Sequence, residues 1–451
     1  MIETRILTQS FNLLRQKMKV SMNMRNMICI YSMLLVRVNA GPNINIFPNF
    51  GGIFGFLFPF RDCETFAPTP AETIPVPEPD DLTYLSTGTI NGISGRKVGT
   101  AVALNRVGTR LVLGGNQKMQ IYDSFTSNAD NSTGWILAKD LSGDFSSWIQ
   151  SIDMNSNGRY IVVSETDTDI TDPTIEAPSD CTVRIYEQDA DSSWSQVGNN
   201  LESETSGVGF GTSVVISDSG DMIAIGAPIG NYVEIRFFGT FISWTLNIDG
   251  FEDDSYFGAS LSLAEDGETL AVGAPHSNNF TGAVHIVDVS SRSLKHTVEG
   301  TTGGGAGVGD YFGTSATLSK DASTLVIGNT GASAVTTFAQ VFRYNSIQDE
   351  YLQVGLISDE GTRATGWSIA LSSNGEIAVI GMPYDDDSGT NAGKTIVITI
   401  GESSLSALAT FPGSATGDLS GTSVAVSDDG TAIAIGAVGS TIGHVRIFNA
   451  E

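Results

Sequence analysis

Two short acidic segments hold the residues best suited to binding a metal ion. The first contains Asp385, Asp386, Asp387 and Asn391, and the second contains Asp167, Asp169 and Asp172. Ca²⁺ takes about six to eight oxygen ligands, which closely spaced carboxylate and amide groups can supply. Neighbouring side chains of an extended segment point to opposite faces, so no more than two of the consecutive aspartates can easily share one ion. The sequence predicts at most a weak Ca²⁺ or ligand contact at each segment, and a solvated acidic loop is the alternative interpretation.

The sequence offers little that would support catalysis. It contains four histidines, at positions 276, 285, 296 and 444, without the spacing of a zinc site. A nucleophile elbow and a phosphate loop with its lysine are also lacking, and the glycine run at 303–305 has no lysine after it. We therefore expect a protein that is not an enzyme. A cation-dependent hydrolase or lactonase stays as an alternative, because such sites assemble from distant parts of a chain.

The elements that must position these residues repeat seven times. Phe210-Gly211 is followed sixteen residues later by Gly226-Ala227-Pro228, and Phe257-Gly258 is followed at the same distance by Gly273-Ala274-Pro275. The other five units begin at Val98, Trp148, Phe312, Thr365 and Ser420. Each has two apolar runs joined by a short turn, then two further strands, with loops of variable length. Repeats of roughly 40–50 residues with several strands each are typical of a β-propeller. The sequence predicts an all-β, seven-bladed β-propeller of four-stranded blades over residues 82–451.

The ends of the repeat region predict how the ring closes. The last repeat stops after a third strand at 444–448, so its fourth strand must come from elsewhere. Residues 83–92 precede the first repeat and have the pattern of a fourth strand. Pairing this N-terminal strand with the last blade would remove two exposed strand edges.

The Phe-Gly and Gly-Ala-Pro motifs resemble the FG-GAP repeat of integrin α-chain N-terminal β-propellers. The resemblance covers residues 82–450 and is complete at the repeats that begin at Phe210 and Phe257. It implies extracellular adhesion or ligand recognition through the loops of one face. If the four strands of a blade are called A to D in chain order, this is the face where the B–C loops meet the D–A loops, which lead to the next blade. Calcium-binding members of the family have a longer acidic loop between the first two strands. Here the turns are short, as at 265–268, so we do not transfer the family's calcium sites to this chain.

The N-terminal residues predict export. Residues 1–40 carry six Lys/Arg and one acidic residue, with an apolar stretch at 27–36 before the small residues 38–40. This layout is typical of a secretory signal peptide, and the rival interpretation is an organelle presequence. Residues 41–81 form a Phe/Gly-rich segment and a Pro-rich linker. We expect a secreted or cell-surface protein with no transmembrane helix in the mature chain.

The remaining cysteines and sequons fit this localisation. Removal of the signal would leave Cys63 and Cys181, which we expect either to form a disulfide or to be two unrelated thiols. The sequons at Asn131 and Asn279 are candidate glycosylation sites in predicted loops.

The chain has a formal net charge of −27. Such an acidic field repels nucleic acid and anionic membranes. We therefore expect a monomeric extracellular binding or adhesion module for a protein or glycan, with a structural cell-wall role as a further alternative.

Overall fold

The fold is described from a computed structural model that covers residues 83–127, 132–168, 180–238, 244–300, 311–330, 338–358, 365–439 and 442–450. The chain divides into two compact units, 1–73 and 74–451, and all of these residues belong to the second unit. They form seven antiparallel sheets of four strands each. The predicted all-β, seven-bladed propeller is confirmed. The predicted signal peptide and the predicted segment and linker, which together span 1–81, lie outside the described residues.

Each blade is a meander of four consecutive strands, except the last. Blade 1 contains β2 (Val102–Leu104), β3 (Arg110–Gly115), β4 (Lys118–Thr126) and β5 (Thr133–Asp140), followed by the 3₁₀ helix η2 (Ser142–Asp144). Blade 2 contains β6 (Trp148–Met154), β7 (Tyr160–Thr166), β8 (Thr182–Gln188) and β9 (Trp194–Gln196). Blade 3 contains β10 (Val214–Ile216), β11 (Met222–Ala227), β12 (Tyr232–Phe237) and β13 (Trp244–Asp249). Blade 4 contains β14 (Leu261–Leu263), β15 (Thr269–Ala274), the short helical turn α4 (Ser277–Phe280), β16 (Ala283–Asp288) and β17 (Ser293–Glu299).

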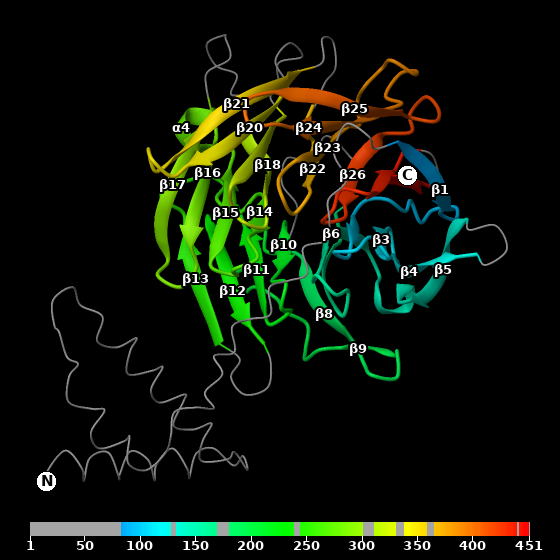
Figure 1. The fold of residues 1–451 in the computed structure, drawn as a ribbon. Coiled ribbons are helices and arrows are strands. Elements are labelled where there is room, and N and C mark those ends of the chain that lie inside the picture. The colour runs from blue at the N-terminus through cyan, green and yellow to red at the C-terminus, as the bar shows by residue number, and fades with distance from the viewer. Residues whose placement is uncertain are drawn as a thin grey trace, which may run out of the picture. The chain divides into compact units, whose positions relative to one another are not determined.

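The last three blades complete the ring (Figure 1). Blade 5 contains β18 (Phe312–Leu318), β19 (Thr324–Asn329), β20 (Phe338–Asn345) and β21 (Glu350–Ser358). Blade 6 contains β22 (Ser368–Leu371), β23 (Ile377–Met382), β24 (Lys394–Ile400) and β25 (Leu405–Pro412). Blade 7 contains β26 (Ser420–Val426), β27 (Ala432–Ala437), β28 (His444–Ala450) and β1 (Tyr84–Asn91).

Blade 7 joins the two ends of the repeat region. Strand β1 pairs antiparallel with β28, from Tyr84 opposite Ala450 to Asn91 opposite His444. The Tyr84 hydroxyl donates a 2.6 Å hydrogen bond to the carbonyl oxygen of Gly430, in the turn between the first two strands of the blade. The blue strand β1 lies beside the red C-terminal strands in Figure 1. The N-terminal strand therefore supplies the fourth strand of blade 7, as its sequence pattern predicts.

The repeated glycines form the contacts between blades. An added Cβ at Gly273 would lie 2.0 Å from the carbonyl oxygen of Gly313, which follows Phe312 in the next blade. The same carbonyl oxygen accepts a 2.9 Å hydrogen bond from the Ser260 hydroxyl. Gly226 meets the carbonyl oxygen of Gly258 in the same way. The two halves of the motif thus belong to one clamp, in which the Gly of Gly-Ala-Pro leaves room for the Gly of the next Phe-Gly.

Blade 2 departs from this pattern, as its degenerate repeat suggests. Ile149 stands in the position of the Phe-Gly glycine and packs over Gly114 of blade 1, where an added Cβ would lie 2.5 Å from Ile149 Cγ2. Ser164 replaces the B-strand glycine, and its hydroxyl accepts a 3.1 Å hydrogen bond from the Ser151 amide. The contacts that blade 2 makes with its neighbours therefore rely on larger side chains.

Candidate functional site: the central cavity and the loop face

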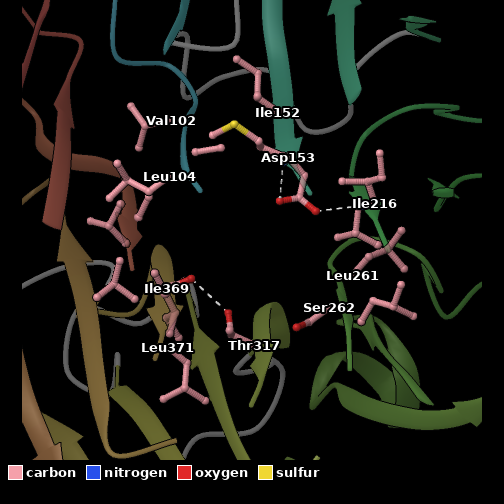
Figure 2. A pocket seen from close by; sticks show the side chains of 18 of the residues that line it. Val102, Leu104, Ile152, Asp153, Ile216, Leu261, Ser262, Thr317, Ile369 and Leu371 are labelled. Carbon is pink, nitrogen blue, oxygen red and sulfur yellow. Dashed lines mark hydrogen bonds between the residues drawn. The ribbon is translucent and has the colours of Figure 1, made fainter. Parts of the chain in front are cut away.

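The innermost strands of all seven blades surround a cavity of about 320 Å³ (Figure 2). Most of the residues around it are aliphatic, among them Val102, Ile152, Leu261 and Ile369, but the surface that they present to the cavity is mainly polar. The sequences of these strands are short apolar runs, because each strand packs against a neighbouring blade on either side. The cavity is thus a product of the ring, since no single blade encloses it.

The middle residue of each inner strand faces the next blade. This residue is small in most blades, for example Ala103 and Ala425, and in three blades it is polar. Ser262 accepts a 2.9 Å hydrogen bond from the Leu318 amide, and Thr317 donates one of 3.0 Å to the Ile369 carbonyl. Asp153 is the only charged residue at this position. These polar side chains satisfy backbone groups of inner strands, which have no strand partner on that side.

Asp153 lies deep in the channel wall of blade 2. Its carboxylate accepts 2.9 Å hydrogen bonds from the amides of Ile216 and Met154. Burial raises the pKa of Asp153 to about 6, although these hydrogen bonds and the charge of Lys320 act in the opposite direction. A half-buried carboxylate with a raised pKa beside a cavity is the kind of group that marks ligand sites.

At one end of the cavity, the turns between the first two strands of a blade are connected in a row that includes every blade except blade 3. Backbone hydrogen bonds of 2.8–3.1 Å connect these turns from one to the next. In each of these bonds a backbone amide donates to a carbonyl of the neighbouring turn: Arg106 to Ser156, Asp428 to Arg106, Ser373 to Asp428, Lys320 to Ser373, and Glu265 to Lys320. The turn of blade 3 is joined to that of blade 2 by side chains instead: the Asn155 side-chain amide and the Ser156 hydroxyl each donate a 3.2 Å hydrogen bond to the Asp218 carbonyl.

Charged side chains also connect these turns. Lys320 of blade 5 pairs with Asp218 of blade 3, and Arg106 of blade 1 lies 3.2 Å from Asp428 and 3.9 Å from Glu265. Burial raises the pKa of Asp428 to about 6, and Asp218 adds to that shift. Burial alone would lower the pKa of Lys320, but the carboxylates of Asp218, Asp153 and Asp428 raise it above its ordinary value. The end of the cavity is therefore a compact network with more acidic than basic groups.

The opposite loops place aromatic side chains at the surface of blades 4 and 5. His276 stacks on Tyr256 with ring centroids 3.8 Å apart, and Phe280 lies edge-on to His276 at 4.8 Å. Tyr311 lies 5.9 Å from Phe280. Phe280 and Phe251 keep 42% and 39% of their surface exposed. These residues come from B–C and D–A loops, so the two kinds of loop meet on one face, which we call the loop face.

The backbone of this cluster is strained. Tyr256, Phe280 and Tyr311 have φ values of 58°, 69° and 52°, in the left-handed region that bulky residues rarely adopt. Backbone hydrogen bonds fix these conformations: the Tyr311 amide donates to the Phe280 carbonyl, and the His276 amide donates to the Ser255 carbonyl, both at 3.1 Å. Strain of this kind gathers at binding sites, where the surrounding structure holds it in place.

The predicted acidic loop of blade 6 contains its own cation. Asp385 is fully buried, and its Oδ2 lies 2.8 Å from the Nζ of Lys394, which also lies 2.7 Å from Oδ2 of Asp387. Asp386 accepts a 2.6 Å hydrogen bond from the Asn391 amide. Lys394 therefore pairs with two of the four predicted residues, and the other two, Asp386 and Asn391, contact each other. No group of three or more His, Cys, Asp or Glu in the described parts of the chain has the arrangement of a metal site. Ca²⁺ binding here stays a prediction.

The other predicted sites are only partly described. Asp167 accepts a hydrogen bond of 2.5 Å from the Ser147 hydroxyl, whereas Asp169 and Asp172 lie outside the described residues. Asn279 is exposed in α4, and Asn131 lies outside the described residues. Both sequons remain untested as glycosylation sites.

Cys181 is buried at the junction of blades 2 and 3. Burial raises the pKa of its thiol to about 12, against the effect of a hydrogen bond with Thr166. Its predicted partner Cys63 lies outside the described residues, so the disulfide stays a prediction.

Comparison with known proteins supports the fold. No family model matches the sequence, and none of the curated proteins matches it. Among solved structures, the β-propeller domain of Cps50 (Swd1) from Myceliophteria thermophila superimposes with a TM-score of 0.55 and 14% sequence identity, covering 80% of this chain and 99% of that chain. At this identity the likeness shows a shared β-propeller fold and nothing finer.

The membrane prediction can be compared with the described residues alone. None of the helices found there is long and apolar enough to cross a bilayer.

Proposed function

We propose that this chain is an extracellular binding or adhesion module that recognises a protein or glycan through its loop face. The propeller fold is well suited to this task, because a rigid ring presents loops from several blades on one surface. The resemblance of the Phe-Gly and Gly-Ala-Pro motifs to FG-GAP repeats supports the same assignment. It also supports a secreted or cell-surface location, which the N-terminal sequence pattern favours.

The aromatic cluster at Tyr256, His276, Phe280 and Tyr311 carries the proposal. Exposed aromatic rings provide large contact areas at low cost in side-chain entropy, and they are enriched at recognition surfaces. Here four rings pack on one another, so their orientations are set before a ligand arrives. Preorganisation of this kind reduces the entropy lost on binding. The acidic residues at 252–254 border the cluster and are exposed.

The charge of the chain narrows the class of ligand. With a net charge of −27, the protein repels polyanions, which makes nucleic acid a poor partner. A protein surface or a neutral glycan offers hydrogen-bond donors to the acidic border and apolar groups to the rings. Neither requires a positive surface on the propeller.

The proposal is tested by probing glycan and extracellular-protein arrays with the propeller and two variants. Phe280→Ala removes an exposed ring of the cluster, and we expect it to abolish or strongly weaken any specific signal. Ile347→Ala is the matched control, because Ile347 is 93% exposed in the turn between β20 and β21, away from the aromatic cluster. A ligand captured equally well by Phe280→Ala would place recognition elsewhere on the protein.

A further inference from the structure

The central cavity contains a carboxylate that lacks an ion-pair partner. Asp153 accepts its two hydrogen bonds from backbone amides, and no cationic side chain among the described residues lies within ion-pair distance of it. An ionised carboxylate has about four lone-pair sites, so two backbone donors leave part of its accepting capacity unused. Figure 2 shows the side chain at the edge of the cavity among the aliphatic residues. It therefore adds a negative charge to a cavity that Arg106, Lys320 and Asp428 also line.

The basic residues at the end of the cavity are already paired. Lys320 pairs with Asp218, and Arg106 pairs with Asp428. Both ion pairs connect turns of different blades and so stabilise the ring. Asp153 is an additional negative charge that neither pair neutralises. Burial raises the pKa values of Asp153 and Asp428 to about 6, although the charge of Lys320 acts on both in the opposite direction.

We propose that the central cavity is a binding site for a small organic ammonium ion. The ammonium group would lie toward Asp153, and an aliphatic body would pack against the inner-strand side chains such as Ile152 and Leu261. A cavity of about 320 Å³ is at the lower end of the range for small-ligand sites, which is roughly 300–1,000 Å³. A metal ion fits less well, because the described residues contain no suitable group of three ligands. The body of an organic cation can also contact the aliphatic side chains of the lining, which a bare ion leaves without contacts.

Three probes of the same shape and different charge test the proposal. Cyclohexylammonium, cyclohexanol and cyclohexanecarboxylate are titrated into the full chain by calorimetry at pH 7.5, above the raised pKa of Asp153. We expect cyclohexylammonium to bind at least about tenfold more tightly than cyclohexanol, and the carboxylate to give no signal. This comparison uses the unaltered protein, so it does not depend on whether a variant folds.

Two variants then locate the site. Asp153→Ser removes the charge but keeps a side chain that accepts a backbone hydrogen bond, since Ser262 does this at the equivalent position of blade 4. We expect it to weaken cyclohexylammonium binding by about tenfold or more. Glu350→Gln changes an exposed acidic residue of β21 and should leave binding unchanged. A thermal midpoint for each variant shows that the ring is intact.

Three results would overturn the proposal. The first is no cyclohexylammonium binding to the unaltered protein at millimolar concentrations. The second is equal binding of cyclohexanol, which would mean an apolar cavity without charge recognition. The third is unchanged ammonium binding by a folded Asp153→Ser variant, which would place the cation at another acidic surface.

Discussion

The clamp between blades makes a sharp prediction for Gly273→Ala. The added methyl group would start 2.0 Å from the Gly313 carbonyl oxygen and 2.3 Å from the Ser260 hydroxyl oxygen. Carbon and oxygen atoms in contact normally lie more than 3 Å apart, so blades 4 and 5 must separate by about 1 Å or the Ser260 hydroxyl must leave the carbonyl. Overpacking of this kind costs about 1–3 kcal/mol, and loss of the hydrogen bond costs about 0.5–1.5 kcal/mol. Reduced entropy of the unfolded chain returns about 0.4–1 kcal/mol.

The net expectation is a loss of about 2–3 kcal/mol in the free energy of unfolding. Urea denaturation followed by tryptophan fluorescence measures it, and Gly143→Ala is the control. Gly143 lies in η2 with no atom within 4 Å of an added Cβ, so we expect a change of less than about 0.5 kcal/mol there. Ser260→Ala combined with Gly273→Ala should cost less than the sum of the single changes, because both act on the same carbonyl. If Gly273→Ala is as stable as Gly143→Ala, the glycine clamp is not what sets the spacing of the blades.

Three further predictions concern other parts of the ring. Lys394→Met should destabilise the fold by about 3–5 kcal/mol, because it leaves the buried Asp385 carboxylate unpaired. Asp387→Asn changes a side chain that is 70% exposed and should cost less than about 1 kcal/mol. Equal urea midpoints for the two variants would contradict this role of Lys394. A fragment that begins at residue 96 lacks β1 and should aggregate through the exposed edge of β28. A fragment that begins at residue 81 keeps β1 and should stay monomeric in size-exclusion chromatography. Identical behaviour of the two fragments would refute the closure of the ring by β1. Because burial raises the folded-state pKa of Asp428 to about 6, above its unfolded value, the ionised carboxylate destabilises the fold above about pH 6, and this penalty is lost as the pH falls toward about 4. Asp428→Asn should therefore make the free energy of unfolding less dependent on pH between about 4 and 6, and an unchanged slope in urea titrations would argue against a buried, ionisable Asp428.

The fold could be predicted because its most constrained part is local in sequence. The interval from Phe257 to Gly273 spans one hairpin, and both ends of that hairpin take part in contacts with neighbouring blades, so an insertion there would break the clamp. The unpaired third strand at 444–448 likewise required a partner, and β1 was the one unassigned strand pattern in the repeat region. Loop lengths carry no such restriction, which explains why the starts of the blades are unevenly spaced.

The site could be predicted only in part. The acidic loop at 385–387 was visible in the sequence, but the role of Lys394 depends on how that loop folds back onto the start of β24. Asp153 had a detectable signal, namely a charged residue where the other inner strands have alanine, valine, serine or threonine. The sequence signal of the aromatic cluster was weaker, because tertiary contacts set the left-handed conformations at Tyr256 and Tyr311, where glycine or asparagine would be usual.

Recognition through the loop face is the central claim, and hydrogen exchange tests it most directly. Amide exchange of the propeller is measured with and without the ligand that the arrays identify. The account predicts slower exchange in 251–256 and 276–281 when the ligand is bound, because these segments form the aromatic cluster and its acidic border. Protection confined to the turns on the opposite side of the blades, such as 345–349, would contradict it.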